Sequence, residues 1–192
     1  ESPSGEAPLE RGREQEKGES SGRTRSEPRQ REPTSWEGPY HRQWFGQLTT
    51  CYDLRDEVNP QGGIDCAKDI YNQAGITNPR NEIDCAEIYV PFSWYEPMWL
   101  ENLGFTDIGE GWKLTNEGLT ELEGDLPINM SGGVLSSNPI GASGMIRFGE
   151  AALQVMGLAE DHQVKNAKVA MGHAYGGAAQ FFSMWIVSST KD

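Results

Sequence analysis

Three short segments carry groups that could take part in chemistry, and each leaves a predicted strand or enters a predicted helix. Tyr89 lies in the first, Asn138 in the second, which is rich in glycine, and His173 and Tyr175 in the third. An imidazole or a phenol can move a proton in a transition state, whereas an amide cannot act as a base near neutral pH. Backbone N–H groups of a glycine run at a helix N-terminus can bind an anion or an oxyanion. These groups indicate acid–base chemistry on a substrate that develops negative charge.

Apolar periodicity predicts the elements that would position these segments. Helices are predicted over residues 65–74, ended by Gly75, and over 94–103, 115–122 and 144–156. Strands are predicted over residues 83–90, 126–129, 168–171 and 178–187. Residues 172–177 are predicted to form a tight turn that joins the last two strands in an antiparallel pair. The apolar face of the last helix is predicted to consist of Ile146, Phe148, Ala152, Leu153 and Val155. This order of elements indicates an α/β fold with a mixed sheet.

The second segment resembles the signature of the thiolase superfamily, an Asn-x-x-Gly-Gly run that leads to Gly-His-Pro-x-Gly-Ala-Ser/Thr-Gly at a helix start. The matching residues are Asn129, Gly132, Gly133, Pro139, Gly141, Ala142, Ser143 and Gly144. The first segment lies where thiolases carry Asn-Glu-Ala-Phe and sterol-carrier-type thiolases carry His-Asp-x-Phe, and Phe92 keeps the phenylalanine. The third lies where thiolases carry Cys-x-Gly-Gly-Gly. The resemblance covers residues 64–190 and implies the C-terminal half of a thiolase-like αβαβα sandwich.

The sequence departs from the thiolase pattern at each reactive position. The His that activates a nucleophilic Cys in thiolases is Asn138 here, and Tyr89 replaces the Asn or His of an oxyanion hole. The acid–base Cys of the last motif is absent, and His173 and Tyr175 lie there instead. The nucleophilic Cys of thiolases belongs to their N-terminal domain, outside the segment that this chain resembles.

The resemblance implies an acyl-CoA-processing enzyme that forms or cleaves a C–C bond next to a thioester. An acyltransferase is one version. The other is a retro-aldol lyase, because thiolase-like aldolases of steroid side-chain breakdown have tyrosines in place of the Cys and His groups. In the lyase version Tyr175 or Tyr89 acts as acid or base, Asn138 and the 141–144 amides hold the thioester oxygen, and His173 assists. The expected substrate-binding residues are Phe92, Gly141, Ala142, Ser143, Gly144, Gly176 and Gly177.

Non-catalytic interpretations stay open beside these roles. The chain could be a lipid or acyl-CoA binding module, or a subunit that completes another chain's active site. Tyr89 could cap a loop, Asn138 could be the turn residue favoured before Pro139, and His173 could bond only to backbone. The aromatic residues of 94–103 could form core, or meet a bulky apolar substrate or a partner.

The resemblance also implies partners: an acyl-CoA substrate, a thiolase N-terminal domain, a second copy in a homodimer, and a zinc-ribbon/OB-fold protein. No bound cofactor or metal is expected, because the CoA thioester is a substrate. The net charge of −13 argues against nucleic acid or an anionic membrane as the main partner. No apolar run reaches the ~18 residues that span a bilayer. Three cysteines without a CxxC pair indicate reduced thiols and a cytoplasmic location.

Composition divides the chain into three parts. Residues 1–35 are rich in Glu, Arg, Ser, Gly and Pro, so they bury too little apolar area to offset the entropy of ordering and are predicted to be disordered. Residues 36–63 are predicted to be an irregular linker, and residues 64–192 an incomplete thiolase-like C-terminal domain.

Overall fold

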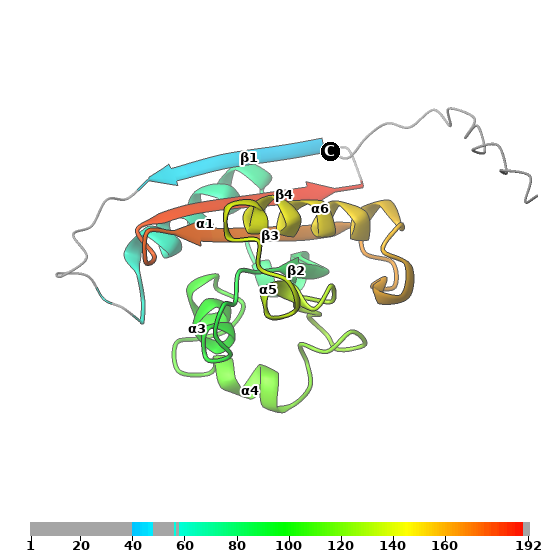
Figure 1. Ribbon diagram of the computed structural model, residues 1–192, viewed down its shortest axis with the longest axis horizontal. Coiled ribbons are helices and arrows are strands. Elements are labelled where there is room, and N and C mark those ends of the chain that lie inside the picture. The colour runs from blue at the N-terminus through cyan, green and yellow to red at the C-terminus, as the bar shows by residue number, and fades with distance from the viewer. Residues whose placement is uncertain (1–39, 48–55, 57, 190–192) are drawn as a thin grey trace, which may run out of the picture. The chain divides into compact units, whose positions relative to one another are not determined.

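The computed structural model of the chain describes residues 40–47, 56 and 58–189, and of 40–47 only the backbone (Figure 1). The predicted disordered tail, residues 1–35, lies outside the described residues. In the described part no helix is both long enough and apolar enough to cross a membrane.

The described strands form one mixed sheet. They are β1 (Tyr40–Gln47), β2 (Cys85–Glu87), β3 (Val169–Gly176) and β4 (Phe181–Ser188), in the order β1-β4-β3-β2. β4 is antiparallel to both β1 and β3, whereas β2 runs parallel to β3. The α/β fold with a mixed sheet and an antiparallel last pair is therefore confirmed.

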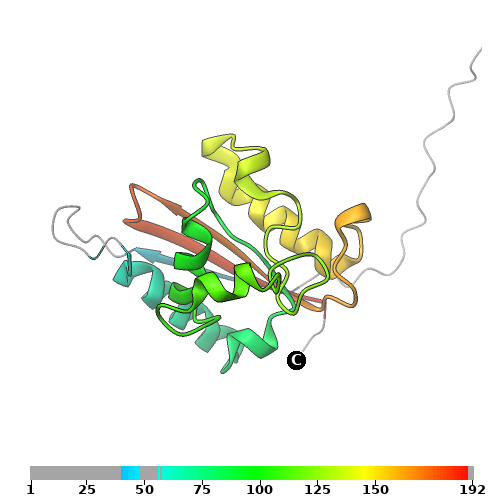
Figure 2. The same ribbon diagram turned by 90° about the horizontal axis from the view of Figure 1, so that it is seen from below.

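Helices lie on both faces of this sheet. They are α1 (Gln61–Ala74), α2 (Pro79–Glu82), α3 (Tyr95–Asn102), α4 (Gly111–Asn116), α5 (Gly133–Ser136) and α6 (Ser143–Met156), with 3-10 turns η2 (Ile140–Ala142) and η3 (Glu160–His162). α1 contacts β1 and β4, and α6 contacts β2, β3 and β4. Figure 2 shows α1 and α6 on opposite sides of the sheet. α1 ends at Gly75 with φ +72°, the left-handed stop that the sequence predicts.

The glycine-rich segment 172–177 is not a tight turn, so that prediction was wrong. β3 continues to Gly176, and the chain turns after it through Ala178 and Ala179, whose φ angles are 52° and 61°. Gly172 serves close packing instead, since a Cβ there would lie 3.2 Å from Trp185 and 3.4 Å from the backbone of α6. Glycine in a strand often marks such an approach of neighbouring groups.

Other boundaries also differ from the sequence prediction. β1 lies inside the segment 36–63 that was predicted to be irregular. It pairs with β4, which is far away in the sequence, so the local sequence pattern did not predict it. β2 has three residues, and the predicted strand 126–129 is reduced to one bridge between Ala86 and Ile128. The short polar helix expected over 115–122 is α4, which ends at Asn116.

The buried face of α6 is more polar than the sequence suggested. Its buried residues are Ser143, Arg147, Ala151, Gln154 and Val155, so of the five predicted apolar members only Val155 is buried and the others are half-buried. Arg147 and Gln154 are buried because each meets polar partners inside the fold. Two core clusters result, a large one that includes residues of α1 and α3 and a smaller one that includes residues of α6.

Candidate active site

The candidate active site lies where the parallel strands β2 and β3 end and α6 begins. Tyr89 follows β2, Tyr175 is near the end of β3, and Asn138 precedes η2 and α6. The carboxyl ends of parallel strands are where α/β folds commonly bind ligands.

Asn138 joins the end of β2 to the start of α6. Its Oδ1 accepts a hydrogen bond of 3.2 Å from the Tyr89 hydroxyl and one of 2.6 Å from the hydroxyl of Ser143, which is fully buried. Because both bonds use the amide oxygen, the amide N–H groups are left to donate to a substrate oxygen. α6 has no side-chain cap. The N–H groups of Ala142 and Ser143 donate to the carbonyls of Pro139 and Ile140, so further donors beside Asn138 have to come from the residues that follow.

The two predicted phenols belong to one aromatic cluster. The rings of Tyr89 and Tyr175 meet edge to face, with centroids 5.1 Å apart and planes at 88°. Tyr175 also contacts Tyr95 at 5.7 Å and Trp99 at 5.2 Å. The structure thus brings together Tyr89, Asn138 and Tyr175, three of the four residues that were predicted from the sequence to be catalytic.

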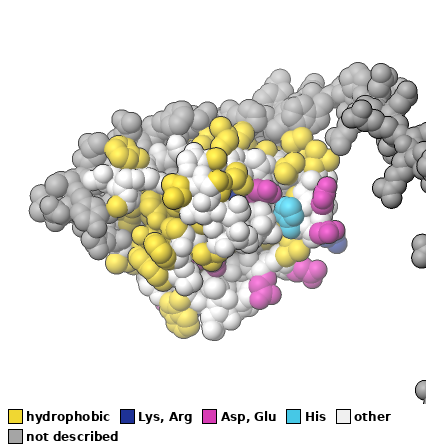
Figure 3. All heavy atoms as spheres, viewed as in Figure 1, with side chains coloured by type: hydrophobic (Ala, Val, Ile, Leu, Met, Phe, Trp, Pro, Cys, Tyr) yellow, Lys and Arg dark blue, Asp and Glu magenta, His cyan; other side chains and the backbone are white. Residues whose placement is uncertain are grey.

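A run of near-parallel rings extends from this cluster to the surface, and we call it the aromatic wall (Phe92, Trp94, Tyr95 and Trp99). Neighbouring planes differ by 20–26°, and centroids lie 4.1–5.8 Å apart. Trp99 is fully buried, while Phe92 and Trp94 are 60% and 56% exposed. Figure 3 shows hydrophobic side chains gathered on the half of this face that holds α3. The sequence placed Phe92 at the substrate, and the structure places it at the outer end of this wall.

His173 lies behind the phenols, inside the core. It is fully buried, and its Nδ1 accepts a 3.3 Å hydrogen bond from the backbone N–H of Tyr89. Burial lowers the pKa of His173 to about 3, so the imidazole stays neutral at ordinary pH. The Trp99 ring lies 5.0 Å from it, and the Trp99 indole N–H donates to the Tyr89 carbonyl. His173 and Trp99 together fix the backbone that carries the Tyr89 phenol.

The predicted glycines fall into two groups. Gly144 lets α6 approach β3, because a Cβ there would lie 2.9 Å from the Cβ of Ala174. Gly141 and Ala142 are exposed just before α6, next to Asn138 in the chain. Gly176 pairs with Phe181, and Gly177, with φ +58°, opens the turn to β4. These last two shape the hairpin end.

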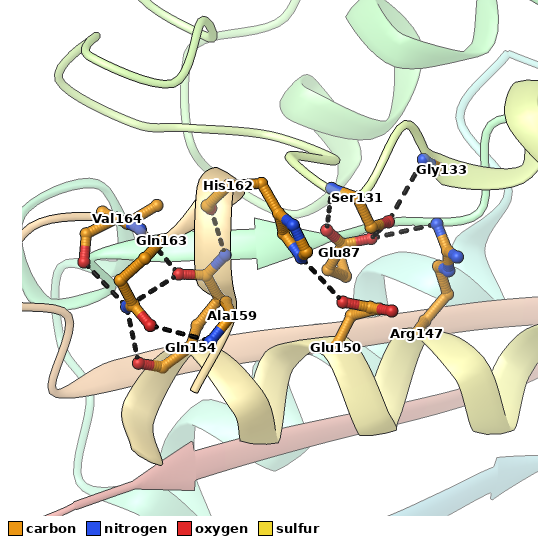
Figure 4. Close-up of polar contacts among 10 residues, drawn as sticks. All are labelled: Glu87, Ser131, Gly133, Arg147, Glu150, Gln154, Ala159, His162, Gln163 and Val164. Carbon is orange, nitrogen blue, oxygen red and sulfur yellow. Dashed lines mark hydrogen bonds and ion pairs between the residues drawn. The ribbon is translucent and has the colours of Figure 1, made fainter. Parts of the chain in front are cut away.

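A buried ion pair beneath the site was missed by the sequence analysis. Glu87 of β2 and Arg147 of α6 lie 2.9 Å apart and are almost wholly buried (Figure 4). Glu87 also accepts hydrogen bonds from the Ser131 backbone N–H and hydroxyl, at 3.0 and 2.8 Å. Burial raises the pKa of Glu87, and the nearby Arg147 and Ser131 oppose that rise. Two features of the sequence could have indicated this ion pair: Glu87 lies within an apolar strand, and Arg147 lies on the buried face of a helix.

The same ion pair supports the Asn-x-x-Gly-Gly turn. The Asn129 side chain accepts a 2.8 Å bond from the Ile88 N–H, and Gly133 comes within 3.3 Å of Arg147 at its missing Cβ position. At the other end of α6, Figure 4 shows a second network, in which Gln154 bonds Gln163 and Val164 and Glu150 pairs with His162. Both ends of α6 are therefore held by polar contacts.

Neither described cysteine is placed to act as a thiolase nucleophile. Cys66 and Cys85 are buried in the two core clusters, and burial raises the pKa of the Cys85 thiol to about 12. Among the described residues, no three His, Cys, Asp or Glu side chains are grouped to hold a metal ion.

Residues 50–189 match the family model described as "Thiolase C-terminal domain-like". The chain belongs to this family. The thiolase-like domain is 32% identical over 138 residues to an acetyl-CoA acetyltransferase of Methanothermobacter thermautotrophicus, a match that covers 71% of this chain and 36% of that protein. It is 36% identical over 113 residues to human sterol carrier protein 2, covering 58% of this chain and 20% of that protein.

Among solved structures, the thiolase-like domain matches the "Ltp2-ChsH2(DUF35) aldolase". The TM-score is 0.64 and the identity 25%, over 79% of this chain and 39% of that one. The resemblance inferred from the glycine-rich motif is thereby confirmed. The chain spans well under half the length of each of these relatives.

Proposed function

We propose that the protein to which this thiolase-like domain belongs cleaves a C–C bond beside a CoA thioester, and that its acid–base groups are phenols. The observation that carries the proposal is the hydrogen bond from Tyr89 to Asn138, with Tyr175 against the same ring. A thiolase reaction needs a base beside a nucleophilic thiol, and Asn138 cannot be that base. The solved relative is named as an aldolase, which agrees with a lyase.

The proposed reaction is a retro-aldol cleavage of a β-hydroxyacyl-CoA. A base takes the β-hydroxyl proton, a carbonyl forms at Cβ, and the Cα–Cβ bond breaks. The bonding pair passes to Cα and is delocalised as the thioester enolate. Protonation of Cα then releases an acyl-CoA. The two demands on the protein are proton transfer and stabilisation of the enolate oxygen.

The geometry supports a division of these tasks. The Asn138 amide and the N–H groups at the start of α6 donate to the thioester oxygen, where negative charge develops. One phenol, as its phenolate, takes the hydroxyl proton, and the other donates a proton to Cα. His173 holds the Tyr89 backbone and moves no proton, because its imidazole has neither solvent contact nor a pKa near neutrality.

Assays of the full-length protein with β-hydroxyacyl-CoA and β-ketoacyl-CoA test this proposal. Tyr89→Phe and Tyr175→Phe should each reduce cleavage of the β-hydroxy ester by at least ~100-fold, the lower end of general acid–base contributions. Tyr95→Phe is the matched control, since it keeps a ring in the aromatic wall and should retain activity. Thiol-dependent cleavage of the β-keto ester that neither phenol affects would instead assign the protein to the acyltransferases.

The aromatic wall is suited to binding a substrate whose acyl group carries a bulky ring. Stacked rings favour flat partners over flexible chains, and the exposed end of the wall leaves room for one. Trp94→Leu should therefore weaken the binding of a CoA ester with a phenyl-bearing acyl group more than that of one with an n-hexyl group. Trp112→Leu removes an equally exposed indole from α4 and should change neither.

A non-catalytic role is the second candidate, and exposed apolar surface beside the site supports it. Large apolar side chains are exposed around the site, namely Phe92, Trp94, Leu135, Ile140 and Met145. We propose that a thiolase N-terminal domain, a second copy, or a zinc-ribbon/OB-fold protein covers part of them. The name of the solved relative joins two components, which agrees with a partner protein here. Binding of the CoA esters without turnover of either would support this candidate.

A further inference from the structure

The chain at the end of β2 pairs with a short segment that precedes the glycine-rich motif. The backbone N–H of Ala86 donates to the Pro127 carbonyl at 3.0 Å, and the backbone N–H of Asn129 donates to the Ala86 carbonyl at 2.9 Å. A parallel bridge joins Ala86 to Ile128. Bonds in a parallel ladder run in turn from one chain to the other, so the N–H of Ile88 would next meet the carbonyl of Asn129.

The side chain of Asn129 takes the place of that carbonyl. Asn129 has a φ of 55°, and its carbonyl accepts from the N–H of Gly132 at 2.8 Å, outside the ladder. Its side-chain oxygen accepts from the N–H of Ile88 at 2.8 Å instead. Asparagine suits this position, because it tolerates the left-handed conformation and carries an acceptor on a short side chain.

His173 makes a similar replacement on the other side of the same chain. The last paired positions of β2 and β3 are Glu87 and Gly172, so Tyr89 lies two residues beyond the ladder. The N–H of Tyr89 donates to the imidazole of His173, a residue of β3, at 3.3 Å. The consecutive N–H groups of Ile88 and Tyr89 are therefore each held by a side chain, and the two side chains come from opposite neighbours.

These two bonds place the phenol of Tyr89. Its hydroxyl reaches Oδ1 of Asn138 at 3.2 Å, beyond the usual range for two hydrogen-bonded oxygens, so a small shift of the main chain is enough to break the contact. Ile88 is fully buried, and without the Asn129 oxygen its N–H would lose its acceptor away from water. An unpaired N–H there costs free energy, so the main chain should move to find another acceptor.

We propose that Asn129 is a positioning residue for Tyr89, an inference that rests on the proposed function of the phenols. Its side-chain oxygen holds the N–H of Ile88 on one side of the chain, while His173 holds the next N–H on the other. Asn129 acts through the main chain and moves no proton. The asparagine of the Asn-x-x-Gly-Gly turn thereby connects that turn to the candidate active site.

Three single variants of the full-length protein test the proposal with a β-hydroxyacyl-CoA. Asn129→Gly keeps the left-handed conformation and removes the acceptor, so kcat should fall by about 10- to 100-fold with KM near the wild-type value. Asn129→Asp keeps an acceptor oxygen and should restore most of the rate. Asn166→Gly is the matched control, because Asn166 also has a left-handed φ, of 61°, and lies on an exposed turn before β3. It should leave kcat unchanged.

A double variant separates positioning from general support of the fold. In the Tyr89→Phe background, Asn129→Gly should cause no further loss of kcat, because the phenol that it positions is already gone. A loss of equal size in both backgrounds would overturn the proposal. So would Asn129→Gly with the full wild-type rate.

A crystal structure of the full-length Asn129→Gly variant tests the same inference without turnover. The Tyr89 hydroxyl is expected to lie beyond hydrogen-bonding distance of Asn138, whose contact with Ser143 should remain. A Tyr89 that has not moved would rule out the positioning role. A displaced phenol, in a protein that cleaves neither CoA ester, would support the positioning role and reject the proposed reaction.

Discussion

The backbone N–H of Tyr89 donates to Nδ1 of His173 across 3.3 Å, so the imidazole holds the main chain of the residue whose phenol reaches Asn138. His173 is therefore a positioning residue in the proposed reaction. Its side chain contacts the aromatic core and not the solvent-facing side of the site.

Substitutions at His173 separate positioning from proton transfer. His173→Leu removes the acceptor, and we expect kcat to fall by about 10- to 100-fold, because small displacements of a catalytic group carry such losses. His173→Asn places an oxygen near the Nδ1 position and should restore most of the rate. KM and the pH profile of the remaining activity should match the wild type. A shifted acid limb in His173→Asn would show that the imidazole titrates during turnover.

The buried imidazole also makes stability depend on pH. The pKa of His173 in the folded protein is about 3, below its ordinary value near 6.5. Between these two pH values the imidazole is protonated in the unfolded chain and neutral in the folded protein. Its contribution to stability is therefore complete above pH 6.5 and is lost as the pH falls from there toward 3. Between pH 7 and 5 the loss is about 2 kcal/mol.

Urea unfolding of the full-length protein at pH 7 and pH 5 measures this loss. His173→Leu should lower stability at both values but remove this part of the difference between them. His162→Gln deletes a half-buried histidine paired with Glu150, and this variant should keep the full loss of stability between pH 7 and pH 5 that His173 causes. Equal pH dependence in wild type and His173→Leu would show that the imidazole is accessible to protons.

The Glu87–Arg147 pair should respond asymmetrically to single and double substitutions. Arg147→Met leaves a buried carboxylate without its partner, and we expect a loss of about 3–5 kcal/mol in the free energy of unfolding. The deficit should shrink as the pH falls toward 5, because burial raises the pKa of Glu87 and a protonated Glu87 needs no cation. The double variant Glu87→Gln/Arg147→Met should recover most of the loss.

Lys113→Met supplies the comparison for that experiment. It breaks the exposed pair between Lys113 and Glu110, and such pairs contribute about 0–1 kcal/mol. If Arg147→Met destabilised the protein no more than Lys113→Met does, the buried pair would not hold β2 against α6. A double variant as unstable as Arg147→Met would point to lost packing rather than an unpaired charge.

Local signals in the sequence were enough for some features and not for others. Gly75 ends α1 and the motif around Pro139 leads into α6, because both depend on residues adjacent in the chain. The burial of His173 depends on Trp99, which lies 74 positions earlier and meets it only through the fold. Side-chain type alone could not tell a solvent-facing imidazole from one enclosed by rings.

Long-range pairing also explains the missed strand and ion pair. β1 is defined by its bonds to β4, at the opposite end of the chain. Arg147 interrupts an apolar helix face, and its partner Glu87 lies 60 positions earlier in β2. A pattern of apolar residues assigns charged side chains to the surface, whereas here two opposite charges lie next to each other in the interior.

Two glycines of α6 give a matched test of how closely this helix must approach the sheet. A Cβ on Gly144 would lie 2.9 Å from the Cβ of Ala174, whereas a Cβ on Gly149 would have nothing within 4 Å. Gly144→Ala should therefore cost about 1–3 kcal/mol through overpacking. Gly149→Ala should stabilise the helix by about 0.5–1 kcal/mol, the ordinary gain of alanine over glycine.

The same pair of variants connects helix position to the proposed chemistry. Gly144 follows Ser143, whose hydroxyl holds Asn138, so a displaced helix start should also move the amide and lower kcat. Gly149→Ala should leave kcat unchanged. Unfolding and turnover measured on the two variants check both effects. If Gly144→Ala matched Gly149→Ala in stability and rate, the close approach of α6 to β3 would have no part in placing Asn138.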